Sequence, residues 1–370
     1  MNRRTGVLIV DDSAVMRSLL RTVISADSAL EVVGTASDGD SALGLLASPS
    51  VHPGIVLLDV EMPGMDGLET LRAIRARSYR MPVIMVSAVT QRGARVTIEA
   101  LAGGASDYVT KPASQSDRES ALRTLALNLL PKIQALTRTA ASPSRPDDPV
   151  AGVSRSTPRA LIPPAVVAIG ASTGGPAALD AILSGLPPGF PVPVLVVQHM
   201  PELFTGLLAE RLGIHCPLRV REAAEGIPVL PGSVYVARGN WHMQVLAPVR
   251  PGSAPMLHLH QGPMENHCRP AVDVLFRSVA AVYGSAGLAV VLTGMGSDGL
   301  AGSHLIRSQG GTVLAQDQAS SVIWGMPGAV VQAGIAHQVL PLTRFVPEIL
   351  RLVSNQRLNP LAALKPAANL

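Results

Sequence analysis

Short apolar runs alternate with helical patterns along most of the chain, and this alternation constrains the fold more than any other feature. In the first part of the chain the apolar runs lie at 7–10, 31–34, 55–58, 83–86 and 107–109. The segments between them, at 14–26, 40–47, 67–76, 92–102 and 117–130, show helical spacing of apolar residues. Each run and its following helix make one βα unit, and five such units predict a doubly wound parallel sheet.

The same alternation returns after residue 163. Predicted strands lie around 166–169, 194–198, 234–236, 289–293 and 312–315, with helices near 175–183, 204–212, 272–282 and 299–309 and a possible antiparallel hairpin at 243–260. Between the two halves, 131–163 mixes prolines with Ser, Thr, Arg and Asp and keeps no apolar period, as linkers do. A chain of 370 residues suits two domains. We therefore expect α/β domains at 1–130 and 164–355, a linker at 131–163 and a tail at 356–370.

In the first half, polar residues whose side chains can take part in chemistry follow the predicted strands. They are Asp11, Asp12, Asp59, Ser87 and Lys111. Parallel sheets collect functional groups at the carboxyl ends of their strands, so these residues should converge on one edge. Close carboxylates favour a divalent cation that prefers oxygen ligands, most simply Mg²⁺. Asp59 can then accept a phosphoryl group while Mg²⁺ and Lys111 neutralise charge on its oxygens. The alternative is that the aspartates only cap a helix and that the lysine is solvated.

The motifs Leu-Ile-Val-Asp-Asp, Leu-Leu-Asp-Val-Glu-Met-Pro-Gly-Met-Asp-Gly, Val-Ser-Ala and Val-Thr-Lys-Pro resemble those of bacterial response-regulator receiver domains over about 5–130. The resemblance implies a flavodoxin-like fold and phosphorylation of Asp59 by a partner histidine kinase. It also implies a metal held by Asp12, Asp59 and the backbone carbonyl of Glu61, with Asp11 close by. Ser87 and Tyr108 would form a switch pair, and the bond between Lys111 and Pro112 would be cis.

In the second half, the strand before Gly170 runs into a glycine turn that carries Ser172. Gly170, Ser172 and Gly174 form a G-x-S-x-G pattern, which suits a nucleophilic serine at a strand end. Taken alone, such a turn more often cradles a phosphate or packs a helix against a sheet. A serine nucleophile needs a base and an acid that orients it. His199 follows the strand at 194–198 and Asp298 follows the strand at 288–293, so three strand ends deliver serine, histidine and aspartate to one edge.

Three other interpretations of the second half compete with this triad. Gly294, Gly296 and Gly299 mimic a dinucleotide-binding fingerprint, but that pattern is weak alone and leaves Ser172 unexplained. His258 and His260 alternate as in a strand and can pair on a metal, yet no third ligand has an obvious spacing. Cys268 is a conceivable nucleophile, but the sequence shows neither a paired base nor a cause for a lowered pKa.

The second half is similar to the catalytic domain of chemotaxis-type protein-glutamate methylesterases, which are also glutamine deamidases, over about 164–350. The resemblance rests on Ile-Gly-Ala-Ser-Thr-Gly-Gly-Pro, Val-Gln-His-Met, Arg-Pro-Ala-Val-Asp-Val-Leu-Phe, Leu-Thr-Gly-Met-Gly-Ser-Asp-Gly and Ala-Gln-Asp. It implies Ser172 as nucleophile, His199 as general base and acid, Asp298 as orienting carboxylate, and an oxyanion hole from the N–H groups of Thr173 and Met295. The segments 237–239 and 265–269 depart from the family pattern.

That resemblance implies hydrolysis of glutamate γ-methyl esters on methyl-accepting chemoreceptors, with no cofactor for the ester chemistry and Mg²⁺ for receiver phosphorylation. We expect the unphosphorylated receiver to restrict access to Ser172. The competing function is a phosphorylation-controlled adaptor whose hydrolase domain is idle. A net charge of +4 without a basic stripe gives no case for nucleic-acid binding. The absence of a signal-like N-terminus and of unbroken apolar spans predicts a cytoplasmic protein that does not insert into membranes.

Overall fold

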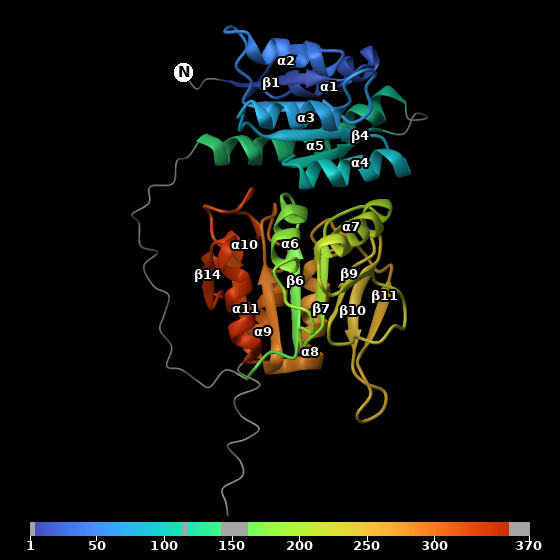
Figure 1. Ribbon diagram of the computed structural model, residues 1–370, viewed down its shortest axis with the longest axis vertical. Coiled ribbons are helices and arrows are strands. Elements are labelled where there is room, and N and C mark those ends of the chain that lie inside the picture. Colours follow the sequence, from blue (N-terminus) through green and yellow to red (C-terminus); the bar gives the residue numbers. More distant parts are fainter. Residues whose placement is uncertain (1–3, 113–116, 142–161, 355–370) are drawn as a thin grey trace, which may run out of the picture. The chain divides into compact units, whose positions relative to one another are not determined.

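The chain folds into two compact units, Met1–Pro146 and Asp147–Leu370. Figure 1 shows them in a computed structural model, in which the structure describes residues 4–112, 117–141 and 162–354. The division falls inside the segment that the sequence predicts as a linker. Most of that segment, 142–161, and the predicted tail at 356–370 lie outside the described residues.

The first unit contains the predicted five-stranded parallel sheet. Its strands are β1 (Thr5–Val10), β2 (Leu30–Ala36), β3 (Ile55–Asp59), β4 (Val83–Ser87) and β5 (Asp107–Thr110). They are arranged in the order β2-β1-β3-β4-β5. This is the flavodoxin-like order, in which the sequence of strands reverses direction at β1 and β3. The carboxyl ends of β1 and β3 therefore lie side by side. Asp11 and Asp12 directly follow β1, and Asp59 is the last residue of β3.

Helices connect the strands and cover the sheet. They are α1 (Ala14–Ser25), α2 (Gly39–Ala47), α3 (Gly67–Ala76), α4 (Gln91–Ala102) and α5 (Arg118–Ala141). Side chains cap the first four: Ser13, Asp38, Asp66 and Thr90 each accept a backbone N–H from the first turn. The local sequence thus fixes where each helix begins after its strand.

Helix α5 crosses the predicted boundary at residue 131 and continues to Ala141. The predicted start of the linker is wrong at this point because Pro131 is taken into the helix. The physical reason is an apolar stripe at helical spacing: Leu125, Leu129, Ile133 and Leu136 are all buried. Packing of this stripe offsets the hydrogen bond that the proline cannot donate.

The second unit is built on a seven-stranded parallel sheet. Its strands are β6 (Val166–Ala171), β7 (Val194–Gln198), β8 (Arg219–Glu222), β9 (Ser233–Val236), β12 (Gly287–Val291), β13 (Thr312–Gln316) and β14 (Gln338–Leu340). The strand order is β14-β13-β12-β6-β7-β9-β8. The central strands β12, β6 and β7 are wholly buried. The second doubly wound α/β domain is confirmed, and its central strands are the ones that lead to Asp298, Ser172 and His199.

The remaining elements of this unit cover the sheet or flank it. The helices are α6 (Gly175–Leu183), α7 (Glu202–His215), α8 (Val272–Tyr283), α9 (Leu300–Ser308), α10 (Met326–Gln332) and α11 (Phe345–Ser354), with 3-10 turns at Gly284–Ala286 and Leu342–Arg344. The strands β10 (His242–Leu246) and β11 (Met256–His260) pair antiparallel and confirm the predicted hairpin.

The sequence prediction missed the two edge strands of this sheet, β8 and β14. The sequence of β8 is Arg-Val-Arg-Glu, which is charged and lies at the edge, where side chains stay in contact with water. The strand β14 has three residues, too few for a periodic signal. Among the described residues no helix is both long enough and apolar enough to cross a membrane.

Candidate active site and phosphorylation site

Ser172 and His199 stand at neighbouring strand ends. Ala171, the last residue of β6, is the register partner of Gln198, the last residue of β7. The N–H of His199 donates to the carbonyl of Ala171 at 3.1 Å, so the pairing continues one residue beyond the strands. The expectation that the sheet carries both residues to one edge agrees with this geometry.

The backbone around Ser172 is held on both sides. Its N–H donates to the Thr293 carbonyl at 3.0 Å, and its carbonyl accepts from Gln198 Nε2 at 2.9 Å. The left-handed residue that turns the chain into α6 is Gly174, with a φ of 78°. A side chain there would come within 2.6 Å of Val322, so only glycine fits. Gln198, which is 2% exposed, is a positioning residue that sequence analysis did not identify.

Asp298 contacts the imidazole of His199. Its Oδ2 is 2.8 Å from His199 Nε2, and Oδ2 also accepts the N–H of Val272 at 2.6 Å. Its Oδ1 accepts the N–H groups of Asp273 and Gly299 at 3.0 and 2.9 Å. Burial alone would raise the pKa of Asp298, but the hydrogen bonds from His199 and from these amides lower it. Asp298 is thus a buried, ionised acceptor.

The partners of His199 change its basicity. Burial by itself lowers the pKa of the imidazole, but the hydrogen bond to Asp298 and the contact with Cys268 outweigh burial and raise the pKa to about 9. The contact with Cys268 joins its Sγ to His199 Nδ1 at 3.5 Å. Sequence analysis set Cys268 aside because no paired base was visible. The fold brings the base to it.

Asn266 is another neighbour of the site that sequence analysis did not single out. Its Nδ2 donates to Asp298 Oδ1 and to Asp273 Oδ2, each at 3.0 Å. Asp273 lies in the first turn of α8 and is 4% exposed, so the amide bridges two carboxylates. Burial raises the pKa of Asp273, and the nearby charge of Asp298 acts in the same direction. The departure from the family pattern at 265–269 therefore lies beside the triad.

The loop that carries Asp298 also supplies the predicted oxyanion donor. Gly294 packs so closely on Ser172 that an added Cβ would lie 2.8 Å from the serine Cβ. The next residue, Met295, has a backbone N–H that donates to no acceptor among the residues the structure describes. Thr173, the other predicted donor, directly follows Ser172 in the turn and is buried. Thr173 is thus the sequence neighbour of the serine, and Met295 is the sequence neighbour of the glycine that packs on it.

The packing around the glycines of this loop bears on the dinucleotide interpretation. In that fingerprint the glycines leave room for a pyrophosphate. Here Gly294 is in contact with Ser172 and Met326, and Gly299 is in contact with Val272 and Phe276. At Gly294 and Gly299 the protein itself fills the space, whereas a Cβ at Gly296 would meet nothing within 4 Å. The packing of Gly294 on Ser172 is the feature that the dinucleotide interpretation leaves unexplained.

In the first unit, Lys111 joins two buried carboxylates. Its Nζ is 3.0 Å from Asp11 Oδ2 and 2.8 Å from Asp59 Oδ2, and the two aspartates are 0% and 1% exposed. Burial, with Asp11 nearby, raises the pKa of Asp59 to about 6 despite the opposing hydrogen bond from Lys111. Burial lowers the pKa of Lys111, but its two carboxylate partners outweigh that and raise it. The predicted convergence at this strand edge agrees with these contacts.

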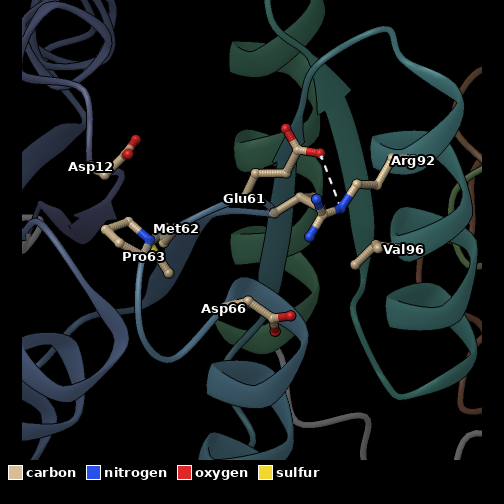
Figure 2. Close-up of a pocket in the computed structure, with 8 residues that line it drawn as sticks. Asp12, Glu61, Met62, Pro63, Asp66, Arg92 and Val96 are labelled. Atoms are coloured by element: carbon tan, nitrogen blue, oxygen red, sulfur yellow. Dashed lines mark ion pairs between the residues drawn. The ribbon is translucent and has the colours of Figure 1, made fainter.

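Asp12 completes a group that suits a metal ion. Ligand oxygens of Asp11, Asp12 and Asp59 all lie within 4.8 Å of one another, the one such group of three among the described residues. Carboxylate oxygens are the donors that Mg²⁺ prefers. Asp12 and Glu61 also line a cavity of about 290 Å³, in which Figure 2 shows the Glu61 side chain reaching toward Arg92, 4.0 Å away. The donor set therefore fits Mg²⁺ at an accessible place.

Other predicted residues of the first unit occupy less accessible positions. Ser87 is fully buried at the end of β4 and donates to the carbonyl of Ala88 at 3.2 Å. Tyr108 is 7% exposed, and Lys132 Nζ binds its carbonyl at 2.7 Å. The predicted cis bond at Lys111 is wrong, because the single cis peptide in the described chain precedes Pro270. Lys111 reaches inward without it.

The two histidines proposed as a metal pair have other partners. His258 Nδ1 lies 3.1 Å from Glu225 Oε1, and His260 Nδ1 accepts the N–H of Gly262 at 3.1 Å. His258 and His260 stack, with ring centroids 5.6 Å apart. They join no group of three ligands in the part of the chain that the structure describes.

Fold and sites together define a class: an α/β hydrolytic domain that follows a receiver domain. The receiver-domain family model matches residues 7–123, and the CheB methylesterase family model matches residues 167–349. The chain is 48% identical to a protein-glutamate methylesterase/protein-glutamine glutaminase of Trichodesmium erythraeum over 94% of this chain and 98% of that protein. It is also 48% identical to one from Nocardioides, over 95% and 96%. The chain belongs to this methylesterase family.

A solved structure supports the same assignment for the second unit. The methylesterase catalytic domain of Thermotoga maritima CheB matches with a TM-score of 0.50 and 42% identity, covering 52% of this chain and all of that one. The sequence predictions of the family, of an enzyme of the methylesterase class and of both α/β folds are thereby confirmed.

Proposed function

We propose that the second unit hydrolyses glutamate γ-methyl esters by a serine mechanism. His199 takes the proton of Ser172 as the serine oxygen attacks the ester carbonyl, and Asp298 stabilises the imidazolium that forms. Collapse of the tetrahedral intermediate releases methanol, with His199 returning the proton, and leaves an acyl-Ser172. Water then attacks this acyl group by the same route. The observation that carries the proposal is the 2.8 Å His199–Asp298 pair at the strand end next to Ser172.

The N–H groups of Thr173 and Met295 form the proposed oxyanion hole. The Met295 N–H has no acceptor within the described residues, and Gly294 packs on the serine. A donor in such a position stabilises a developing oxyanion by about 3–4 kcal/mol. Fixed donors of this kind are effective because they need no reorganisation when the charge appears.

The proposed substrates are methylated glutamates on methyl-accepting chemoreceptors, because the relatives are named for methylesterase activity on protein glutamate. Those names also include glutaminase activity, and the same site acting on a side-chain amide would release ammonia. The chemistry of the ester step uses the chain's own side chains and needs no cofactor. We place the reaction in the cytoplasm.

The receiver unit controls this activity in our proposal. A chemotaxis-type histidine kinase transfers its phosphoryl group to Asp59. Asp12, Asp59 and the Glu61 carbonyl, with Asp11 close by, would hold Mg²⁺, which would supply neutralisation of the phosphoryl charge. Lys111, 2.8 Å from Asp59, holds one carboxylate oxygen of the acceptor. The unphosphorylated receiver restricts access to Ser172, and phosphorylation shifts this equilibrium.

Methanol release from a methylated receptor cytoplasmic fragment tests the proposal. Wild type and Ser172→Ala are compared, each with and without a small phosphoryl donor and Mg²⁺. Ser184→Ala, an exposed serine at the end of α6, is the matched control. We expect release that the donor stimulates, that vanishes in Ser172→Ala and that persists in Ser184→Ala. Wild-type protein that releases no methanol under any condition would favour the idle-hydrolase adaptor instead.

A further inference from the structure

A tight turn at 265–268 touches two members of the triad at once. The N–H of Glu265 donates to the Cys268 carbonyl at 3.1 Å, and the N–H of Cys268 donates to the Glu265 carbonyl at 2.8 Å. Between them, Asn266 and His267 both adopt left-handed φ angles, 51° and 62°. This geometry points Asn266 at Asp298 and Cys268 at His199. The two contacts are therefore made by one rigid turn.

Both ring nitrogens of His199 are engaged in this structure. Nε2 pairs with Asp298 at 2.8 Å, and Nδ1 pairs with Cys268 Sγ at 3.5 Å. Ser172 Oγ makes no hydrogen bond with any residue that the structure describes. A neutral imidazole offers one donor and one acceptor. In this neutral form, the one that can act as a base, Nε2–H is donated to Asp298, so Nδ1 is the single acceptor left and the thiol occupies it.

We propose that Cys268 is a positioning residue that competes with Ser172 for Nδ1 of His199. The inference rests on the proposed serine mechanism, because that mechanism requires Ser172 to donate its proton to this nitrogen. Whenever the imidazole is neutral, the thiol holds its Nδ1. Catalysis begins when the serine hydroxyl replaces the thiol at Nδ1.

The size of the effect follows from the net strength of one hydrogen bond. A net hydrogen bond of about 1 kcal/mol corresponds to a population ratio of about fivefold. A rate that requires the minor arrangement falls by the fraction that is populated. Removing the thiol should therefore raise kcat without changing the groups that bind the ester.

The first test compares the esterase kinetics of Cys268→Ala and Cys268→Ser with wild type. We expect kcat to rise about fivefold in Cys268→Ala with KM unchanged, because His199 is then free for Ser172. Cys268→Ser keeps a donor on the same turn, and because a hydroxyl is a stronger donor than a thiol, kcat should stay at or below the wild-type value. A residue with a purely structural role would lower kcat when removed. A fall in kcat for a folded Cys268→Ala would overturn the competition.

The second test does not depend on esterase activity. In a Cys216→Ser background, Cys268 is the one remaining cysteine of the sequence. Its sulfur attacks the methylene carbon of iodoacetamide, a C–S bond forms, iodide leaves and the thiol proton passes to the neutral form of His199. We expect His199→Gln to slow this alkylation about fivefold at pH 9, where a large fraction of His199 is neutral, and Ser172→Ala not to slow it.

The two tests separate the inference from the function on which it rests. Alkylation that is indifferent to His199→Gln would refute the thiol–imidazole pair, whatever the esterase does. Full esterase activity in Ser172→Ala would refute the serine mechanism and the competition with it, while His199-dependent alkylation would still establish the pair.

Discussion

At the scale of single residues, His199 is the group whose environment most affects the chemistry. Its side chain is 12% exposed and lies between a carboxylate and a thiol, and these partners raise the pKa of its imidazole to about 9 even though partial burial acts in the opposite direction. A general base must be unprotonated to accept a proton. Below pH 9 the imidazole of the resting protein is mostly protonated, so only a minor fraction can activate Ser172.

The expected consequence is an esterase rate that rises with pH. Initial rates of methanol release at low substrate concentration should increase about tenfold per pH unit at acidic and neutral pH and level off near pH 9, because the neutral fraction of His199 grows in that way. Parallel reactions with Ser172→Ala give the spontaneous hydrolysis to be subtracted. A rate that is already constant from pH 7 upward would contradict the raised pKa.

At the scale of elements, helix α5 shows how packing overrides a local signal. Pro131 and the polar residues after it predict the end of a helix, yet α5 runs on to Ala141. Ile133 lies beyond the proline and is 0% exposed, whereas Leu127 lies before it and is 71% exposed. The helix is therefore held by its buried face across the proline.

These two residues give a matched pair of variants. Ile133→Ala should lower the free energy of unfolding of the receiver unit by about 2–5 kcal/mol, because it leaves a cavity in a packed interior. Leu127→Ala should change it by less than about 0.5 kcal/mol, because the side chain is mostly in water. Urea unfolding followed by the signal of the receiver unit measures both. Equal effects of the two variants would mean that α5 does not pack as described beyond Pro131.

At the scale of the whole molecule, the two units carry complementary chemistry. The first holds a carboxylate group suited to Mg²⁺, and the second holds the His199–Asp298 pair to which we assign ester cleavage. Our proposed control requires energetic coupling between them. Couplings of this kind are typically about 1–3 kcal/mol, which corresponds to a change of about 5- to 150-fold.

Removing the first unit tests that coupling. Because α5 continues to Ala141, the deletion must take residues 1–141 rather than end at 130. We expect the shortened chain to release methanol about tenfold faster than the unphosphorylated full chain. Full-length Asp59→Asn, which cannot be phosphorylated, should stay at the low rate with or without donor. Identical rates for the shortened and full chains would show that the receiver does not restrict the site.

The sequence by itself determined the two α/β folds and the convergence of residues at their sheet edges. Buried parallel strands appear as apolar runs, and the polar residue after each run, such as Asp59 or His199, marks a strand end. These signals are local. They survive without knowledge of what packs against them, which is why Asp11, Asp59 and Lys111, or His199 and Asp298, meet as predicted.

Only the tertiary structure decided what surrounds those residues. Asn266 and Cys268 contact Asp298 and His199 across separations of 32 and 69 residues, through a turn whose two left-handed residues carry no glycine signal. The edge strands β8 and β14 and the last part of α5 likewise depend on what they pack against. A hydrogen bond between distant side chains leaves no periodic trace in a sequence, because its energy comes from geometry that the whole fold supplies.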